Sequence, residues 1–358
     1  ATCEEGVILR TIAGRTYRSF ITRTVECDLE DDGIAPSAAA EGYEDEPSCA
    51  APQSKPKPMT HSRKMDVDPQ FHKFLVGKSR STQERLQQET GTQIIIPGMH
   101  SKSHTVVIKG PSEDALERAA TRIQMLLDSA LQRAPYSHFV SVPLRDPAFA
   151  AKFTQFRDTL GKDFSSCEGI DPSLVIEPRR MHLTLVMLKL PTGDLVKRAA
   201  GVLRAATSDF VRGRREELRL RLMGLEYMND DPSQVNILYG KVDEQDGGAD
   251  LQRFACDLIQ GLVTAGILPE EELMKQRIRQ PDGSLRVKLH ATLLNSKFAS
   301  DKGQGGGRPH FDARQILEAH GDSLELGKGC VSEVHLSVLG PVDRSTGYYV
   351  PSEKLQLR

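Results

Sequence analysis

The sequence lacks the features that define several large protein classes. No apolar run approaches the roughly 20 residues of a membrane-spanning helix, and the first residues lack the charged-then-apolar layout of a signal peptide. The 6 cysteines lie far apart without C-x-x-C spacing, which argues against a disulfide framework and a zinc knuckle. We therefore expect a soluble, nucleocytoplasmic protein of a reducing compartment.

The chain also lacks a charge imbalance. Its 47 basic and 49 acidic residues give a net charge of −2, so any contact with nucleic acid must come from local patches. With 358 residues, 38% of them hydrophobic, the chain is long enough for two domains with separate cores.

Residues 1–64 show no sustained periodicity and are rich in acidic, small and breaker residues. This composition predicts a mostly disordered acidic tail. One denser patch, GVILRTIAGRTYRSFI, alternates apolar and basic residues around Tyr17 and Phe20. We expect it either to fold onto a partner or to add a spare strand to the main body.

Residues 65–135 read as strand, short helix, helix, strand, strand and a long amphipathic helix. Ser112 is placed to cap the last helix, whose apolar stripe begins at Ala115 and Leu116. Pro135 ends that helix, and a new strand opens after it. The pattern predicts one small α+β domain.

Residues 136–358 alternate strands and helices in two comparable halves, each with one His-x-Thr: MHLTL at 181–185 and LHATL at 289–293. In strands, the period of two places His182 beside Thr184 and His290 beside Thr292 on one face. The opposite face then carries only apolar residues: Met181, Leu183, Leu185, Leu289, Ala291 and Leu293.

Basic residues precede both motifs. Continuing the alternation upstream adds Arg180 to the first polar face and Arg286 and Lys288 to the second. A cation, an imidazole and a hydroxyl in this order suit a phosphodiester: one histidine takes a proton, the other gives one, and the threonines hold non-bridging oxygens. No metal and no cofactor are required. A single His-x-Thr is more often the solvent-exposed polar face of an amphipathic strand, but two copies in matching contexts favour a phosphodiester site.

Two rival sites compete with this pair. His335 also lies two residues before a serine, Ser337, but Glu333 stands where a basic residue would be expected, so a structural role is favoured. Glu226, Asp230 and Asp231 cluster in EYMNDDP, where turn chemistry is a better explanation than metal binding.

The pair HLTL and HATL resembles the signature of the two-histidine phosphoesterases, over residues 136–358. The resemblance implies two pseudo-symmetric antiparallel-sheet lobes facing across a cleft. It also implies an enzyme acting on phosphodiester bonds, in which His182 and His290 are catalytic and Thr184 and Thr292 grip phosphate.

The stretch VGKSRSTQERLQQETGTQIIIPG resembles the core of a KH domain, whose G-x-x-G loop holds the backbone of single-stranded nucleic acid. Gly77, Lys78 and Ser79 fit this loop, but Arg80 replaces its last glycine. Arginine blocks the close approach of phosphate to the backbone yet supplies a charge of its own. Binding through the loop and Arg85, above a floor of Ile94 and Ile96, and a docking role both remain open.

The order of acidic tail, KH domain and phosphoesterase, with GLEYMNDDP and VKLHATLLN, resembles one family of nuclear complex subunits. The resemblance implies a location in the nucleus, a helicase subunit and a ubiquitin-binding subunit as partners, and roles in transcription coactivation and the response to alkylated DNA. The sequence thus predicts an α+β protein that binds and cleaves RNA or single-stranded nucleic acid. The alternative is a non-catalytic adaptor that binds a nucleotide or a nucleic-acid end and docks onto a helicase complex.

Overall fold

The computed structural model describes residues 7–12, 15–20, 58–98, 101, 103–299 and 309–358. Most of the predicted disordered tail therefore lies outside the described residues. Within it, β1 (Val7–Ile12) and β2 (Arg15–Phe20) pair antiparallel as a two-stranded sheet in a unit of their own. The denser patch thus forms a hairpin, and neither of its strands joins another sheet of the described chain.

The KH region begins with a strand at His61, four residues before the expected boundary at Met65. Its three strands form a sheet in the order β3-β5-β4. The elements are β3 (His61–Asp66), α1 (Pro69–Val76), η1 (Lys78–Arg80), α2 (Ser81–Thr90), β4 (Gln93–Ile95), β5 (Thr105–Gly110) and α3 (Glu113–Arg133).

Local sequence signals explain where these helices begin and what they bury. Asp68 caps α1 ahead of Pro69, a residue pre-organised for a first helical position. Ser112 caps α3 as predicted, since its hydroxyl accepts from the Ala115 amide at 3.3 Å. The apolar stripe of α3 packs on the three-stranded sheet in a small core of its own.

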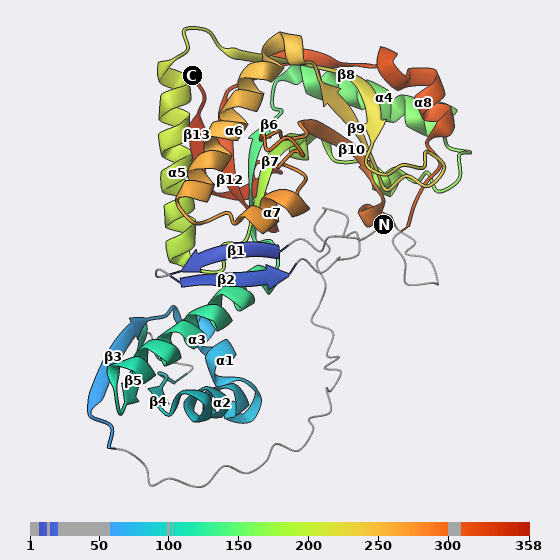
Figure 1. Cartoon of the computed structure of the whole chain (residues 1–358). Helices are drawn as coiled ribbons and strands as arrows, with labels where there is room; N and C mark the ends of the chain where they lie inside the picture. Colours follow the sequence, from blue (N-terminus) through green and yellow to red (C-terminus); the bar gives the residue numbers. More distant parts are fainter. Residues whose placement is uncertain (1–6, 13–14, 21–57, 99–100, 102, 300–308) are drawn as a thin grey trace, which may run out of the picture. The chain divides into compact units, whose positions relative to one another are not determined.

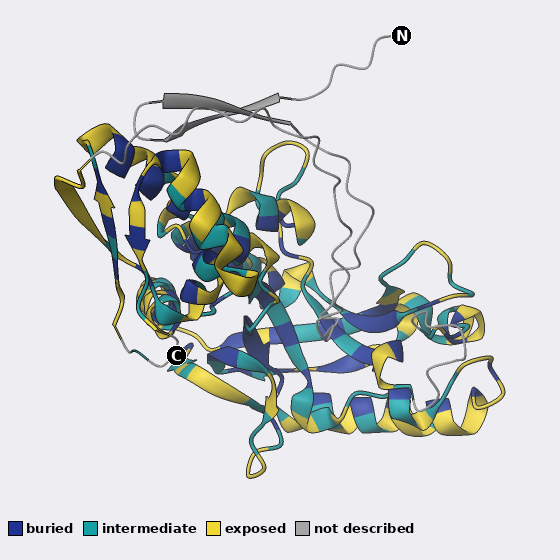
Figure 2. Ribbon diagram, turned by 90° about the horizontal axis from the view of Figure 1, so that it is seen from below, coloured by how far each residue is buried: buried dark blue, intermediate teal, exposed yellow. Residues whose placement is uncertain are grey.

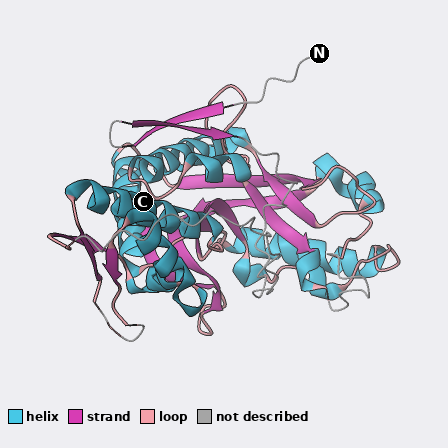
Figure 3. Cartoon of the chain, turned by 60° about the horizontal axis from the view of Figure 1, so that its bottom comes forward, coloured by secondary structure: helices cyan, strands magenta, loops and turns pink. Residues whose placement is uncertain are grey.

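The second region holds an eight-stranded sheet in the order β11-β8-β9-β10-β7-β6-β12-β13, with helices along it (Figure 3). Its strands are β6 (His138–Pro143), β7 (His182–Leu188), β8 (Leu218–Tyr227), β9 (Ile237–Val242), β10 (His290–Asn295), β11 (Glu325–Val331), β12 (Glu333–Val342) and β13 (Tyr349–Gln356). Its helices are α4 (Pro147–Asp163), η2 (Pro172–Leu174), η3 (Pro178–Arg180), α5 (Gly193–Arg212), η4 (Glu244–Gly248), α6 (Ala249–Thr264), α7 (Glu270–Lys275), η5 (Ser296–Phe298), α8 (Arg314–His320) and η6 (Gly321–Ser323). No helix in the described ranges is long and apolar enough to cross a membrane.

The sheet consists of two antiparallel lobes, which confirms the predicted fold class. One lobe is β13-β12-β6-β7 and the other is β10-β9-β8-β11, and they meet through a single residue pair, Ala291 and Leu183. In Figure 1 the two meeting strands, β7 and β10, lie side by side.

The lobes are not the two halves of the sequence, contrary to our expectation. After the second motif the chain returns to the first lobe, where β12 pairs with β6. Helices are exchanged as well. Helix α4 packs so closely on β11 that a Cβ on Gly327 would lie 2.9 Å from the Ala148 carbonyl oxygen. Helix α6 lies against α5, with the rings of Phe210 and Phe254 5.0 Å apart.

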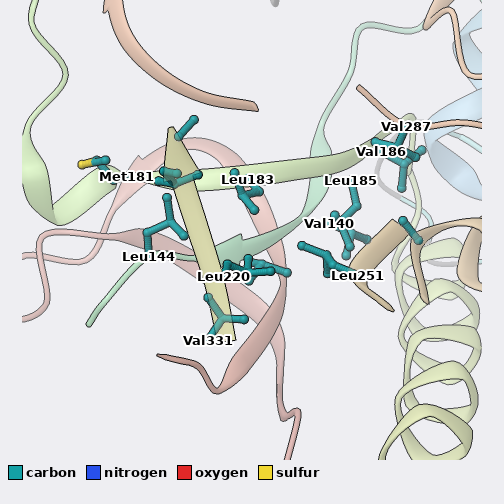
Figure 4. Packing of buried hydrophobic residues seen from close by; sticks show 14 of the residues in the cluster. Val140, Leu144, Met181, Leu183, Leu185, Val186, Leu220, Leu251, Val287 and Val331 are labelled. Atoms are coloured by element: carbon teal, nitrogen blue, oxygen red, sulfur yellow. The ribbon is translucent and has the colours of Figure 1, made fainter. Parts of the chain in front are cut away.

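The apolar faces of the motif strands form part of the large core. Met181, Leu183 and Leu185 point into the cluster seen in Figure 4, and on β10 Ala291 and Leu293 are fully buried. Burying one leucine contributes roughly 1.5–3 kcal/mol, so this alternation also stabilises the fold. Figure 2 shows where the buried residues lie across the chain. The polar faces of both motifs are consequently directed away from the core.

Candidate functional site

The two histidines begin neighbouring strands. His182 is the first residue of β7 and His290 the first of β10. The strands are antiparallel and Ala291 pairs with Leu183, so the residues that separate each histidine from its threonine are strand neighbours. The two His-x-Thr motifs therefore meet at their central residues.

Both imidazole rings are held by the same contact. Nδ1 of His182 lies 2.6 Å from the carbonyl oxygen of Arg180, and Nδ1 of His290 lies 2.7 Å from that of Lys288. A carbonyl oxygen only accepts, so Nδ1–H donates, and in the neutral ring the lone pair is on Nε2. The two strands thus present their histidines in the same tautomer.

Aromatic side chains surround His182. Its ring centroid lies 5.3 Å from that of Phe139, 5.5 Å from that of Tyr349 and 6.1 Å from that of Tyr348. The Tyr348 hydroxyl is 2.9 Å from Ser141 Oγ. Burial raises the pKa of Tyr348, so this phenol stays protonated and can act as a donor near neutral pH.

The neighbour of His290 is instead a tyrosine that contacts charged side chains. Tyr239 lies 5.1 Å from His290, centroid to centroid, and donates a hydrogen bond to the Glu226 carboxylate. Lys288 Nζ is 3.7 Å from the same carboxylate and 5.0 Å from the Tyr239 ring centroid. Burial, and then the hydrogen bond to Glu226, raise the pKa of Tyr239. Lys241 is the strand neighbour of His290 on β9.

The predicted cations do not continue the strand faces. Arg180 ends the short helix η3. Its Nε is buried and has no hydrogen bond, and it lies 3.8 Å from a Glu177 oxygen. Arg286 is exposed and pairs with Glu244. The alternation fails here because the regular strands begin only at the histidines.

His335 occupies a different environment from the pair. It is 1% exposed within β12, its Nε2 lies 3.0 Å from Glu333 Oε2, and its ring lies 5.4 Å from that of Tyr348. Burial lowers its pKa. This packing supports the structural role expected from the sequence.

The rival carboxylates do not gather into one site. Glu226 lies on β8 with Tyr239 and Lys288 as partners, while Asp231 accepts from both the amide and the hydroxyl of Ser233, as in a turn. Across the described ranges, no group of three or more His, Cys, Asp or Glu side chains is placed to hold a metal ion.

The KH loop keeps a glycine-like backbone at both ends. Gly77 has φ +70°, and a Cβ there would lie 2.2 Å from Thr82 Oγ1, so only glycine fits. Ser79 and Arg80 have φ of 51° and 69°, in the left-handed region that normally costs a non-glycine residue about 1–2 kcal/mol. Arg80 therefore adopts the conformation that a glycine takes without strain.

A groove of about 610 Å³ lies beside this loop. Gly77 and Arg80 line it together with Lys73, a cation that the sequence pattern did not single out. The lining is His72, Lys73, Val76, Gly77, Arg80, Gln83, Glu84, Gln87, Gln93, Ile94, Ile95, Ile96, Pro97 and Gly98. The expected floor residues Ile94 and Ile96 are thus present.

Three predicted residues lie outside the groove lining. Lys78 and Ser79 are exposed in the loop. Arg85 points elsewhere on α2, with its Nε 4.0 Å from Glu89. The helical period of 3.6 accounts for this, because it turns position 85 away from the face that carries Gln83 and Gln87.

The aromatic neighbours of the histidines were also not predicted from the sequence. Tyr239 had a usable signal, since it alternates with Lys241 in a strand-like segment, and it pairs with Thr292. Tyr348 and Tyr349 had none, because they reach His182 only through the pairing of strands remote in sequence.

The fold and the matched histidine strands define a two-histidine phosphoesterase-type domain that follows a KH domain. The chain belongs to the AKAP7 2'5' RNA ligase-like domain family, whose model matches residues 136–357. A KH domain model matches residues 62–125.

One curated relative is similar over nearly its whole length. It is activating signal cointegrator 1 complex subunit 1 of Mus musculus, 28% identical over 356 residues, covering 94% of this chain and 95% of the relative. Two solved structures are also similar. TT0787 of Thermus thermophilus has a TM-score of 0.38 and 20% identity, covering 62% of this chain and 98% of that chain. E. coli LigT complexed with 3'-AMP has a TM-score of 0.32 and 15% identity, covering 63% and 98%.

Proposed function

We propose that the chain is a metal-independent phosphodiesterase of RNA or single-stranded nucleic acid, with His182 and His290 as its general acid and base. The observation that carries the proposal is the shared anchoring of the two rings: each Nδ1 donates to the carbonyl two residues upstream. Two imidazoles in one tautomer at adjacent strand ends can remove a proton on one side of a phosphodiester and supply one on the other.

The other side chains have roles in holding the phosphate. Thr184 and Thr292 donate to its non-bridging oxygens, which gain charge in the transition state. Arg180, Arg286 and Lys288 bind the substrate's phosphates as cations. For Arg180, the buried Nε without a hydrogen bond supports this role, because an unmet buried donor is costly until a ligand satisfies it.

The direct test uses the whole chain, labelled single strands and 2′,3′-cyclic nucleotides in excess chelator. We expect turnover without metal and a bell-shaped dependence on pH, since one ring must be neutral and the other charged. Activity that is lost in chelator and restored by magnesium or manganese would contradict the mechanism and redirect attention to Glu226, Asp230 and Asp231. Binding without any turnover would favour the adaptor.

The KH domain is proposed to hold the single strand through Gly77, Lys78, Ser79 and Arg80. Changing Lys78 and Arg80 to alanine together should weaken binding and flatten its dependence on salt, by about 0.7 of slope for each phosphate that the loop no longer neutralises. Arg85→Ala is the matched control, because Arg85 lies within α2, outside both the loop and the groove lining. An unchanged affinity and slope in the double variant would favour a docking role.

The mouse relative is by its name a subunit of the activating signal cointegrator 1 complex. We extend this to the chain as a proposal: a nuclear subunit that works with the helicase and ubiquitin-binding subunits of such a complex in transcription coactivation and DNA-alkylation repair. The 28% identity along almost the full length supports it. Fractionation and co-purification of the tagged full chain test it, and a chain that is absent from the nucleus would contradict it.

A further inference from the structure

The outer edge of β4 in the KH groove is already occupied by side chains. In the sheet order β3-β5-β4, β4 is an edge strand. Its Ile94 carbonyl accepts from Gln83 Nε2 at 2.7 Å, and its Ile94 amide donates to Gln87 Oε1 at 2.8 Å. Both glutamines come from α2, one helical turn apart, and both line the groove.

The remaining polar groups of the two amides follow from elementary chemistry. The Ile94 carbonyl accepts, so only the NH₂ of Gln83 can donate to it, and the Gln83 oxygen is not used in that bond. An N–H can be met only by the oxygen of Gln87, so the Gln87 NH₂ is not used either. The described residues provide no other hydrogen bond for these two groups. The two glutamines therefore present the same hydrogen-bonding groups as the Ile94 backbone, but further from the strand. The Gln83 oxygen replaces the carbonyl as acceptor, and the Gln87 NH₂ replaces the amide as donor.

We propose that Gln83 and Gln87 relay the hydrogen-bonding pattern of Ile94 into the groove and read the edge of an unpaired base there. The proposal rests on the proposed binding of nucleic acid by the KH domain. A base N–H donates to the Gln83 oxygen, and a ring nitrogen or carbonyl of a base accepts from the Gln87 NH₂. Side-chain amides recognise base edges in this way.

The rest of the groove suits a single strand. Lys73 and Arg80 supply positive charge for the backbone, and the 42% exposed Ile95 and the half-buried Ile96 offer apolar surface to base faces. Unpaired bases alone have free edges for such contacts. A peptide strand is disfavoured, because adding it to β4 would require the Ile94 groups that the glutamines already hold.

The test compares Gln87→Glu with Gln88→Glu. The Gln87 variant keeps an oxygen for the Ile94 amide but replaces the outward NH₂ with a second acceptor. Gln88 lies next along α2, is exposed and is outside the groove lining, so its variant controls for the added negative charge. Fluorescence anisotropy of the full chain gives Kd for a strand of about eight nucleotides, twice the four that a KH loop holds, and for an abasic strand of the same length.

On the base-containing strand we expect Gln87→Glu to bind about 10-fold more weakly than Gln88→Glu, as the removal of one base-edge hydrogen bond allows. On the abasic strand the two variants should agree within about twofold, because phosphate contacts do not involve the amide. Gln87→Met compared with Gln88→Met repeats the test without charge, should the glutamate variant fail to fold by circular dichroism.

Two failures are distinguishable. If Gln87→Glu loses the same affinity for the base-containing and the abasic oligonucleotide, while the wild type binds normally, the relay is overturned. The glutamines then only join α2 to β4. A wild-type chain that binds neither strand would overturn the proposed KH function together with the relay.

Discussion

The histidine strands and the KH loop keep different parts of their family patterns. Strands β7 and β10 keep the side chains, His182 with Thr184 and His290 with Thr292, and hold both rings by the same backbone contact. The loop keeps the backbone instead, with Arg80 at φ 69° where the family has glycine. Acid-base chemistry requires particular atoms, whereas a loop that cradles phosphate requires a shape, which another residue can adopt at some cost in strain.

A second contrast lies within the histidine pair. The ring of His182 packs among Phe139, Tyr348 and Tyr349. The ring of His290 packs against Tyr239, which in turn contacts Glu226 and Lys288. The anchoring of the rings is symmetric and their surroundings are not. Under the proposed function, substrate selection would therefore differ between the lobes while the geometry for proton transfer stays matched.

The largest effect should come from removing either histidine. We expect His182→Ala and His290→Ala each to lower kcat by about 10²- to 10⁴-fold, the range for a positioned acid or base, with substrate binding largely intact. The double variant should be scarcely worse than either single one, because both groups act in one step. Steady-state kinetics on a labelled single strand measures this.

His335→Ala is the control for this comparison, and a correctly folded variant should stay within a few-fold of wild type. If His182 and His290 both prove dispensable in a folded chain that still cleaves, the two motifs are only the solvent-exposed polar faces of amphipathic strands. The adaptor function would then be the better account.

The threonines should give the next largest effect. Thr184→Val and Thr292→Val keep the shape of the side chain and remove the hydroxyl, so each should lower kcat by about 10²-fold, as when one transition-state donor is removed. Similar losses would extend the symmetry of the pair to its hydroxyls. Losses confined to KM would instead assign the threonines to ground-state binding.

Replacing Arg80 sharpens the contrast between side chain and backbone. Arg80→Gly should stabilise the loop by about 1 kcal/mol through relief of left-handed strain, whereas Arg80→Ala removes the charge and leaves the strain. Amide hydrogen exchange in α1 and α2 measures the difference. Gly77→Ala should act in the opposite direction, because its Cβ meets Thr82. No gain from glycine at position 80 would contradict the strained-loop account.

The smallest effect concerns acid stability at His335. Its pKa is lowered first by burial, while Glu333 acts to raise it and Arg145 and Lys354 to lower it further; the ring of the buried Tyr348 also packs against it. The unfolded state therefore takes up this proton first as pH falls. The stability contribution is complete above the ordinary histidine pKa of 6.5 and declines as pH drops from there through the lower folded pKa.

Replacing His335 with glutamine should make the free energy of unfolding fall less steeply between neutral and mildly acidic pH. One full proton corresponds to about 1.4 kcal/mol per pH unit, and the change in slope should be a fraction of that. Thermal unfolding at several pH values measures it. His138→Gln is a second test of the same kind, since burial lowers that pKa too. An unchanged slope in the His335 variant would contradict the assignment.

Local patterns were enough to predict the elements and the faces of the motif histidines and threonines. The period of two placed His182 and Thr184 opposite Met181 and Leu183, and the buried apolar face confirms it. Ser112 was predicted as a cap because a hydroxyl before a helical stripe meets an otherwise unpaired amide. The two antiparallel lobes followed from a resemblance rather than from any local pattern.

What the sequence by itself determined is thus the chemistry available on each strand and turn: imidazole with hydroxyl on β7 and β10, and a loop with one glycine and three polar residues in the KH region. Only the tertiary structure decided which of these groups meet. It paired Ala291 with Leu183, brought Tyr348 and Tyr349 to His182, ended the strand faces before Arg180, and turned Arg85 away from the groove. The physical reason is range: periodicity and capping act within a few residues, whereas pairing between remote strands depends on how the whole core packs.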